Sequence, residues 1–213
     1  MCQSCLSWYA RCVAPYIVHA GCSANAFADM RKRMIPRAAG FVVEVGFGSG
    51  LNLPYYDVGK VKRLVGIDPD GTMLGLAEPK SRSVPFDVDC IRASGERLPL
   101  ADSFADTVVV TYAFCTIPDP EAALTEIRRV LKSTGRLIFI EHGQAEGTRC
   151  RKWQERLNLV WGRFAGGCHL NRDPLQLIRA AGLHVVEAER DRFRLPFWQL
   201  GSHHAGIAIP GTG

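Results

Sequence analysis

Hydrophobic positions along the chain gather into short runs that alternate with amphipathic segments of helical spacing. The runs are rich in β-branched residues and are bounded by glycine, proline or aspartate, a pattern that indicates buried β-strands. We expect seven strands, at residues 41–45, 63–68, 89–92, 106–111, 136–141, 184–188 and 206–210.

Two of the intervening helices begin with the dipeptide Asp-Pro, at Asp119 and at Asp173. An aspartate N-cap accepts hydrogen bonds from the first turn, and proline is well tolerated at the first helical position. Glycine favours the residue after a helix, so we expect these helices to end before Gly135 and at Gly182.

A third helix is predicted over residues 72–78, with Asp70 as its N-cap and Pro79 at its end. Residues 1–40 also favour helix and precede the first strand, so we expect 1–36 to be an N-terminal helical extension. Such an extension either packs on the core or forms a lid over a ligand pocket.

Strands that alternate with helices and read as continuous apolar runs predict an α/β fold with a parallel sheet covered on both faces. Ligands of such sheets bind at the carboxyl ends of the strands. The residues expected at those ends are Glu44 to Gly50, Asp68, Ser94 to Glu96 and Tyr112.

Three glycines spaced two apart, Gly46, Gly48 and Gly50, follow the first strand. They leave no side chain between the loop and a ligand, although an ordinary strand-to-helix turn would show the same pattern. Asp68 follows at the distance of a βαβ unit, where an acidic side chain accepts hydrogen bonds from ribose hydroxyls. Helix capping is the alternative for Asp68, but Asp70 is better placed for it.

The loop sequence excludes two common phosphate sites. No Gly-Lys-Ser/Thr follows the glycines, so the loop is not a P-loop. The dinucleotide fingerprint needs a small residue where Leu51 stands, and the extra glycine falls one position early, at Gly50. The loop therefore suits a ligand without pyrophosphate.

The composition agrees with this predicted α/β fold. The chain of 213 residues is 47% hydrophobic and 22% charged, as in soluble globular proteins, and no apolar run approaches the roughly 18 residues of a membrane span. The best N-terminal candidate, Trp8 to Val18, is interrupted by Arg11 and Pro15 and lacks the basic start of a signal peptide. We therefore expect a cytoplasmic protein.

The eight cysteines are expected to be free thiols. Four lie in the first 22 residues, where Cys2 and Cys5 form a CxxC without the second pair that a zinc site needs. The other four are scattered along the chain. The neighbours His203 and His204 point to opposite faces of a strand, so no metal is expected.

The motifs together resemble the class I S-adenosylmethionine-dependent methyltransferases of the type 11 group. The resemblance rests on Glu44 to Gly50, Asp68, Ala93 to Pro99 and Val108 to Val110, and it covers roughly residues 35 to 213. It implies a Rossmann-like, doubly wound, mostly parallel seven-stranded sheet with an antiparallel C-terminal strand. The methyltransferase domain would span 37–213.

The resemblance implies S-adenosylmethionine as the cofactor. The glycine loop would face its methionine part with Glu44 near the amino group, Asp68 would bind the ribose, and the Ser94–Gly95 turn would approach the adenine. Many relatives have aspartate where Ser94 stands. The implied cofactor-binding residues are Glu44, Gly46, Phe47, Gly48, Gly50, Asp68, Pro69, Ser94, Gly95, Glu96 and Thr111.

The C-terminal half is similar to the methyltransferase-like seven group, whose eukaryotic members are membrane-associated alkyl thiol methyltransferases. The similarity rests on these segments: 114–117, 139–143, 167–172 and His203 before Gly206. Unlike that group, this protein is expected to have no hydrophobic N-terminal anchor. The similarity implies a small or lipophilic acceptor, with a thiol as one candidate. Quinone precursors, phospholipid headgroups and a noncatalytic binding module remain alternatives.

Methyl transfer from a sulfonium is an in-line displacement, so few groups need to be catalytic. The candidates at the expected pocket are His142, His169 and Tyr112, although each histidine could equally be a loop residue bonded to backbone. Helical residues 149–164, in an insertion near 146–172, carry tryptophans and basic residues and suggest either peripheral membrane contact or core packing. We expect no nucleic-acid partner. The oligomeric state is left open.

Overall fold

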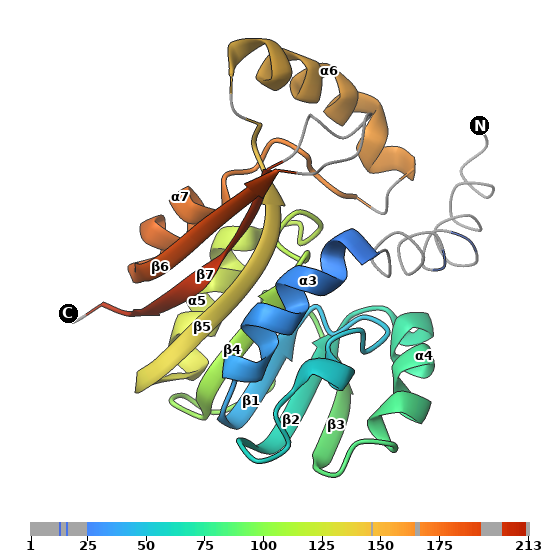
Figure 1. The fold of residues 1–213 in the computed structure, drawn as a ribbon, viewed down its shortest axis with the longest axis vertical. Helices are drawn as coiled ribbons and strands as arrows, with labels where there is room; N and C mark the ends of the chain where they lie inside the picture. The colour runs from blue at the N-terminus through green and yellow to red at the C-terminus, as the bar shows by residue number, and fades with distance from the viewer. Residues whose placement is uncertain are drawn as a thin grey trace.

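The computed structural model describes residues 25–145, 147–164, 167–192 and 202–211, together with Val13 and Tyr16. Within these residues seven strands form one sheet in the order β3-β2-β1-β4-β5-β7-β6 (Figure 1). The strands are β1 (Gly40–Val45), β2 (Val61–Asp68), β3 (Asp87–Arg92), β4 (Ala105–Thr111), β5 (Leu131–Gly143), β6 (Leu183–Arg192) and β7 (Ser202–Pro210).

The first five strands of the sheet order, β3 to β5, pair in parallel. β7 pairs antiparallel with β5 and also with β6. This arrangement confirms the expected α/β fold with a mostly parallel seven-stranded sheet and an antiparallel C-terminal strand. The chain order reverses between β1 and β4, the position at which open α/β sheets bind ligands.

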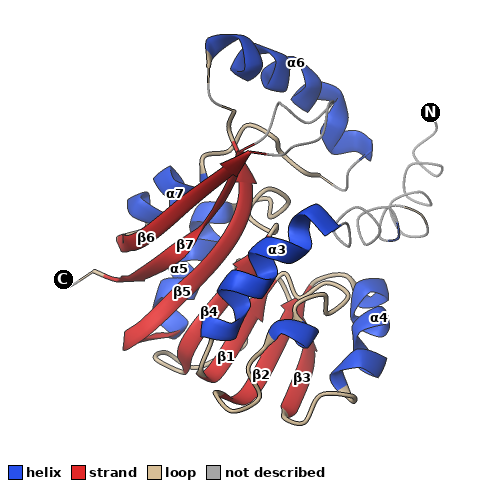
Figure 2. Ribbon diagram, viewed as in Figure 1, coloured by secondary structure: helices blue, strands red, loops and turns tan. Residues whose placement is uncertain are grey.

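Helices cover both faces of the sheet (Figure 2). They are α3 (Asn25–Met34), α4 (Gly71–Ser81), α5 (Pro120–Val130), α6 (Thr148–Phe164) and α7 (Pro174–Ala180), with short 3₁₀ turns at Ile35–Arg37 and Leu53–Tyr55. α6 stands beyond the carboxyl ends of the central strands, at the upper end of the molecule in Figure 1.

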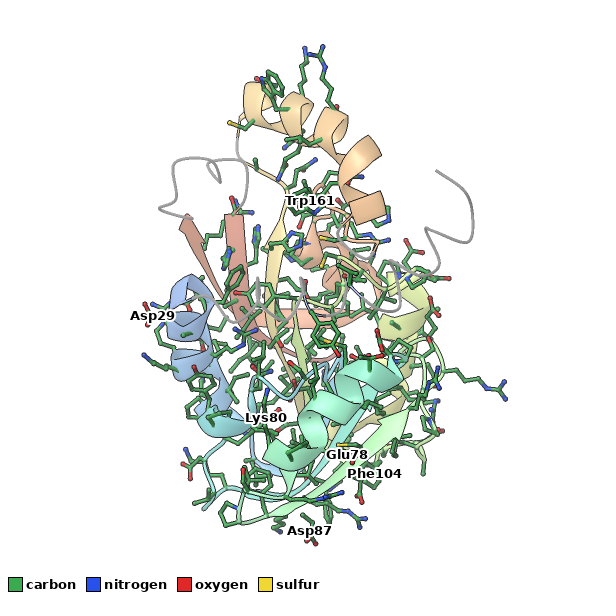
Figure 3. All side chains as sticks on the ribbon, turned by 90° about the vertical axis from the view of Figure 1, so that its right-hand side faces the viewer. Asp29, Glu78, Lys80, Asp87, Phe104 and Trp161 are labelled. Atoms are coloured by element: carbon green, nitrogen blue, oxygen red, sulfur yellow. The ribbon has the colours of Figure 1, made fainter. Side chains whose placement is uncertain are left out.

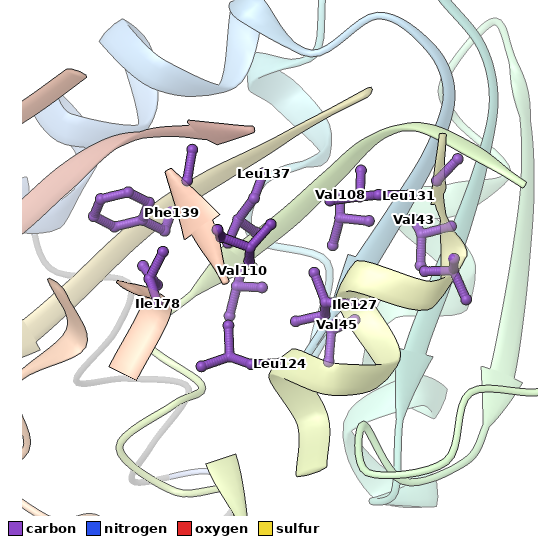
Figure 4. Close-up of a cluster of buried hydrophobic side chains, with 14 of the residues drawn as sticks. Val43, Val45, Val108, Val110, Leu124, Ile127, Leu131, Leu137, Phe139 and Ile178 are labelled. Atoms are coloured by element: carbon purple, nitrogen blue, oxygen red, sulfur yellow. The ribbon is translucent and has the colours of Figure 1, made fainter. Parts of the chain in front are cut away.

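The hydrophobic core has two parts, because successive side chains of a strand point to opposite faces of the sheet. Val43 and Val45 of β1 belong to a cluster under α5 and α7, whereas Val42 belongs to a cluster under α3 and α4. Figure 4 shows the first cluster, in which Ile127 of α5 and Ile178 of α7 meet the strands. Strands buried on both faces have apolar residues at every position, which is why they read as continuous runs in the sequence.

The predicted N-caps are confirmed. Asp70 accepts hydrogen bonds from the Thr72 and Met73 N–H groups, and Asp119 accepts one from Ala122. Asp173 caps α7 in the same manner. Each aspartate satisfies backbone donors that the first helical turn leaves without partners.

Two predicted helix ends are wrong. Pro79 lies inside α4, which continues to Ser81. A proline ring disturbs the bond to the carbonyl four residues earlier, here Gly75, and so close to the helix end few bonds depend on it. The helix before Gly135 ends at Val130, and Gly135 lies within β5 because Leu131 already has extended backbone.

His142 is expected just after the fifth strand, but it lies inside β5 and pairs with His203 of β7. The antiparallel partner β7, which begins at Ser202 instead of Gly206, extends the ladder of β5 past its apolar part. Pairing with a second strand can continue where the hydrophobic pattern ends, because backbone hydrogen bonds do not require apolar side chains.

The described part of the N-terminal extension packs on the sheet. Met30 and Met34 of α3 are buried in the cluster that also contains Ile138 and Ile140 of β5. The aromatic residues Trp8 and Tyr9 of the predicted extension lie outside the described residues. The boundary at residue 36 and the lid role stay predictions.

Candidate functional site

The glycine loop connects β1 to the turn at Leu53–Tyr55, and Gly46, Gly48 and Gly50 all have positive φ, at 77°, 55° and 70°. Residues that have a side chain rarely adopt this backbone conformation. A Cβ at Gly46 would lie 2.4 Å from the Cβ of Ala113, in the loop after β4. The two loops at the switch point are therefore in close contact, and the glycines leave a cradle free of side chains.

Asp68, at the end of β2, holds the glycine loop. Its Oδ2 accepts a hydrogen bond from the Gly48 N–H at 2.8 Å, and its Oδ1 accepts one from the Asp70 N–H at 2.9 Å. Burial raises the pKa of Asp68, and the two backbone donors offset this only in part. The neighbouring Pro69 carbonyl accepts a hydrogen bond from Arg92.

The side chain of Phe47 points into the core beneath the loop. Only 2% of Phe47 is exposed, and a Cβ at Gly66 of β2 would lie 2.5 Å from its ring. On the outer side, Lys80 of α4 donates a hydrogen bond to the Ser49 carbonyl at 2.7 Å; Figure 3 labels this lysine. Phe47 can therefore face a ligand only through its backbone, while its ring supports the loop from below.

Glu44, at the end of β1, is 1% exposed and is bound by two side chains. The Asn52 amide donates to its Oε1 at 2.8 Å, and the Tyr56 hydroxyl donates to its Oε2 at 2.6 Å. Burial raises the pKa of Glu44 to about 7, against the lowering effect of these hydrogen bonds. The carboxyl is thus poised to change protonation near neutral pH.

Asn52 links Glu44 to two further elements. Its amide also donates to Thr111 Oγ1 of β4 at 2.9 Å, and its Oδ1 accepts a hydrogen bond from Arg31 Nε of α3 at 3.0 Å. The Arg31 guanidinium also lies 5.3 Å from the centre of the Tyr112 ring. This network joins α3, β1 and β4 behind the glycine loop.

The Ser94–Gly95 turn follows β3 and is closed by its own polar groups. Ser94 Oγ donates to Glu96 at 2.8 Å, and Glu96 also accepts a hydrogen bond from the Asp119 N–H that begins α5. A Cβ at Gly95 would lie 2.8 Å from a methyl group of Val45, so this turn packs against β1. The turn therefore lies next to the strand that carries the glycine loop.

Tyr112 has a positive φ of 54°, an uncommon backbone conformation for a residue with a side chain. Its N–H donates to the Ile140 carbonyl, and its hydroxyl lies 3.0 Å from His203 Nδ1. Burial lowers the pKa of His203 to about 3, with further lowering by neighbouring positive charges. A neutral His203 can accept the hydroxyl proton of Tyr112 in a hydrogen bond.

Glu141 of β5 organises the loop after β4. Its Oε1 accepts hydrogen bonds from the Ala113 N–H at 2.7 Å and the Phe114 N–H at 3.0 Å. Burial raises the pKa of Glu141 to about 7, although the His142 charge and the backbone donors lower it. The side chain is fully buried, so its role is to hold this loop against the glycine loop.

His142 and Cys168 come together from β5 and the loop after α6, with His142 Nε2 3.2 Å from Cys168 Sγ. Burial lowers the pKa of His142, but the hydrogen bond with Cys168 and nearby negative charge outweigh it and raise the pKa overall. The hydrogen bond with Cys115 and burial raise the pKa of the Cys168 thiol well above its usual value. The Sγ atoms of Cys115 and Cys168 and a ring nitrogen of His142 all lie within 4.8 Å of one another.

His169 does not join this cluster through its side chain. It is exposed, and its Nδ1 lies 3.4 Å from the Asn158 amide of α6. Its backbone N–H donates to the Cys115 carbonyl at 2.7 Å. Burial and the charge of Arg172 lower the pKa of His169.

Comparison with known proteins shows the family to which the chain belongs. A methyltransferase domain model matches residues 43–139, which contain the glycine loop and Asp68. The thiol S-methyltransferase TMT1B of Rattus norvegicus is 31% identical over 173 residues, which make up 79% of this chain and 70% of that protein.

This chain belongs to the class I S-adenosylmethionine-dependent methyltransferases. A second relative of the same group, the thiol S-methyltransferase TMT1A of Homo sapiens, is 27% identical over 187 residues, covering 86% of this chain and 76% of that protein. The crystal structure of the YcgJ protein from Bacillus subtilis shares the fold, with a TM-score of 0.69 over 88% of this chain and 99% of that one, at 17% identity. The cofactor of the methyltransferase is S-adenosylmethionine.

The fold brings most of the sequence-derived residues of this methyltransferase to one edge of the sheet. Sequence reasoning missed Arg31, Asn52 and Tyr56, which complete the network around Glu44. It also missed the approach of Cys115 and Cys168. The loop after the glycines has no periodicity that would point Asn52 or Tyr56 back at the strand, so no sequence signal identified them.

Two surface hollows of the methyltransferase are formed outside the glycine loop. One is formed between α5 and α7 and includes Glu121 and Gln176; the other lies along β3 and α4 and includes Glu78 and Phe104, which Figure 3 labels. Neither contains a glycine-loop residue.

α6 carries an exposed apolar pair, Trp153 at 59% and Leu157 at 37% exposure. Next to this pair on the helix, Gln154 is buried and accepts a hydrogen bond from the Ala145 N–H at 2.7 Å. Trp161 lies between α6 and the sheet (Figure 3). Among the described residues no helix is both long and apolar enough to cross a membrane. The side chains of Val160 and Phe164, counted in the predicted apolar stripe, lie outside the described residues.

The raised pKa of Glu44 predicts a pH dependence of stability. Its ordinary value is 4.5 and its folded value about 7, so between these values the folded state keeps a proton that the unfolded state has released. The contribution of Glu44 to the free energy of unfolding is full below pH 4.5 and is lost as the pH rises through about 7. The loss is about 3 kcal/mol. Urea unfolding across this range should show a smaller decline in Glu44→Gln than in the wild type.

Glu78→Gln serves as the control, because Glu78 is an exposed carboxylate of α4 that pairs with Arg82 at the surface. This variant should keep the wild-type pH dependence. An equal decline in Glu44→Gln and in the wild type would contradict the raised pKa.

Proposed function

We propose that this methyltransferase transfers a methyl group to the sulfur of a small or lipophilic thiol. The observation that carries the proposal is the similarity to TMT1B and TMT1A, both named thiol S-methyltransferases, over more than three quarters of the chain. The similarity extends beyond the cofactor half into the C-terminal half, which holds the groups at the acceptor side of the loop.

The glycine loop suits the methionine part of the cofactor, because its positive-φ glycines expose backbone N–H groups and no side chains. Glu44 supports the loop end and would lie nearest the cofactor's amino group. Asp68 keeps free acceptor capacity for ribose hydroxyls, since each of its oxygens accepts only one of the hydrogen bonds above. The Ser94–Gly95 turn would border the adenine, and Thr111 and Glu96 would act by holding these loops.

S-adenosylmethionine supplies an electrophilic methyl group when bound. The protein must align an acceptor sulfur with that methyl and favour the thiolate over the thiol. His142 is the best-placed group for this, because it lies in β5 beside the loop of Ala113 that touches Gly46. Tyr112 and the more exposed His169 would border the acceptor.

The cofactor site can be tested by thermal stabilisation. S-adenosylmethionine should raise the melting temperature of the wild type, because it binds only the folded chain. Gly46→Val should abolish this shift because the new side chain meets Ala113, and Asp68→Ala should abolish it by releasing the Gly48 N–H. Differential scanning fluorimetry with and without the cofactor measures the shift.

Gly75→Ala is a matched control for the glycine substitution, since nothing lies within 4 Å of a Cβ at Gly75. It should retain the full cofactor-induced shift. If Gly46→Val and Asp68→Ala both kept the wild-type shift, the assigned cofactor site would be wrong.

The acceptor can be tested with cofactor labelled in the methyl group. A panel of an alkyl thiol, a quinol and an ethanolamine phospholipid should give labelled product and S-adenosylhomocysteine with the thiol only. The Asp68→Ala variant provides the background. Transfer to the quinol or the lipid would overturn the thiol assignment, and no turnover with any acceptor would favour a noncatalytic binding module.

We also propose peripheral membrane contact through α6, in the predicted segment 149–164. Trp153 and Leu157 are four residues apart and exposed on one side of the helix, with Arg151, Lys152 and Arg156 exposed around them. An exposed apolar pair within a basic surface suits the interface of an anionic bilayer. Such contact would give the enzyme access to lipophilic acceptors.

Vesicle sedimentation tests this contact. The protein should bind phosphatidylcholine vesicles that contain phosphatidylglycerol, and the double variant Trp153→Ala/Leu157→Ala should bind several-fold more weakly because it loses the apolar anchor. Val58→Ala, which truncates an equally exposed residue of the β1–β2 connection, should bind as the wild type does. Equal sedimentation of the double variant and the wild type would refute the contact.

A further inference from the structure

Three potential metal ligands meet at the carboxyl edge of the sheet. Cys115 follows β4, His142 lies in β5 and Cys168 follows α6, so the group joins segments far apart in the sequence. Their Sγ and ring nitrogen atoms all lie within 4.8 Å of one another, and His142 Nε2 is 3.2 Å from Cys168 Sγ. The cysteines that looked scattered in the sequence thus include a spatial pair.

The separations are close to those of a tetrahedral metal site. Zinc binds thiolate sulfur at about 2.3 Å and imidazole nitrogen at about 2.0–2.1 Å, which places neighbouring ligand atoms about 3.5–3.8 Å apart. The distance from His142 Nε2 to Cys168 Sγ, 3.2 Å, lies just below that range, and all three separations are within 4.8 Å.

The backbone around the three donors is held in place. The His169 N–H donates to the Cys115 carbonyl at 2.7 Å, which ties the two cysteine loops together. Arg172 donates to the Ile117 carbonyl at 2.6 Å and also to the Phe114 carbonyl, on either side of Cys115. Glu141 holds the same loop from the β5 side. A site fixed in this way loses little conformational entropy when a metal binds.

The donor set and its exposure point to an open site. Two thiolates and one imidazole favour zinc, and three protein ligands leave the fourth tetrahedral position for water or substrate. Cys115 is buried, whereas His142 and Cys168 are only partly buried. The donors also adjoin the cofactor cradle, because Ala113, two residues before Cys115, touches Gly46.

We propose that Cys115, His142 and Cys168 bind one zinc ion and that its fourth position takes the sulfur of the thiol acceptor. The acceptor class rests on the proposed function; the metal site does not. The acceptor thiol loses its proton to solvent on binding zinc and remains as a metal-bound thiolate. Its sulfur lone pair forms the new bond to the methyl carbon, and the electron pair of the broken bond stays on the sulfur of S-adenosylhomocysteine.

Zinc would serve two purposes in this arrangement. It would keep the acceptor ionised at neutral pH, where a free thiol with a pKa of about 8.5 is mostly protonated. It would also fix the acceptor sulfur at one point near the cofactor cradle, which supplies the alignment that in-line displacement needs. A quinol or an amine would gain neither effect to the same degree, because zinc of this ligand set prefers sulfur.

Metal content tests the site directly. Full-length protein, kept reduced, is loaded with zinc, dialysed and analysed by mass spectrometry of the metal. We expect Cys115→Ser and Cys168→Ser each to lose about one equivalent of zinc relative to the wild type. Cys90→Ser should lose no zinc, because Cys90 lies in β3 and is hydrogen-bonded to Ser81, in another part of the structure.

Two further measurements distinguish this site from zinc binding at the N-terminal CxxC and from metal loss through unfolding. A Cys2→Ser/Cys5→Ser variant should keep its one equivalent of zinc. This result would exclude the CxxC cysteines as the zinc ligands. Circular dichroism of the Cys168→Ser variant should match the wild type, which excludes loss by unfolding. Wild-type protein that retains no zinc, or that forms a Cys115–Cys168 disulfide under the same reducing conditions, would overturn the metal site.

Cobalt substitution tests the open position without turnover. Cobalt(II) bound by two thiolates should give a sulfur-to-metal charge-transfer band, absent in Cys168→Ser, and an alkyl monothiol should strengthen it whereas a quinol should not. A band that the thiol leaves unchanged would overturn the acceptor's place on the metal. Because these readouts need no methyl transfer, failure of the thiol assignment in the acceptor assay remains distinguishable from failure of the metal site.

Discussion

Buried carboxylates at the carboxyl ends of β1, β2 and β5 hold together the loops on which the site depends. Asp68 accepts a hydrogen bond from the Gly48 N–H. Glu141 accepts hydrogen bonds from the N–H groups of Ala113 and Phe114, and Glu44 accepts one from the Asn52 amide. Loops at the end of a parallel sheet contain backbone donors with no ladder partner, and an unsatisfied buried donor costs about 1–3 kcal/mol. A carboxylate offers several acceptor sites at one point, so one side chain can fix a whole turn.

Burial of these carboxylates disfavours their charged form. Burial raises the pKa of Glu44 and of Glu141 to about 7, so neither carboxyl is held firmly ionised. Nearby positive charge lowers both values, from Arg31 at Glu44 and from His142 at Glu141. The cofactor is itself cationic at its sulfonium and amino groups. Positive charge close to these buried carboxyls therefore favours their ionised form.

The two halves of the domain divide the chemistry between them. The parallel half supplies a cradle made of backbone and carboxylates, suited to a cofactor that many methyltransferases share. The loop after β4, strand β5 and the loop after α6 bring two thiols and an imidazole together, and we assign these groups to the acceptor. The loops after β1 and β4 meet at Gly46 and Ala113, and Cys115, His142 and Cys168 gather beside the second of these loops. Acceptor specificity can therefore change in the C-terminal half while the cofactor site stays the same.

Local rules explain what the amino-acid sequence determined by itself. Continuous apolar runs identified the strands, and aspartate caps placed three helix starts. The spacing of Gly46, Gly48, Gly50 and Asp68 predicted a glycine loop held next to Asp68. Each of these signals depends on neighbours within a few residues or one βαβ unit. Only the tertiary structure decided that Asn52 and Tyr56 turn back to Glu44, that β5 continues through His142, and that Cys115 meets Cys168. These contacts join segments separated by irregular loops, whose path is set by packing and hydrogen bonding and leaves no periodic trace in the sequence.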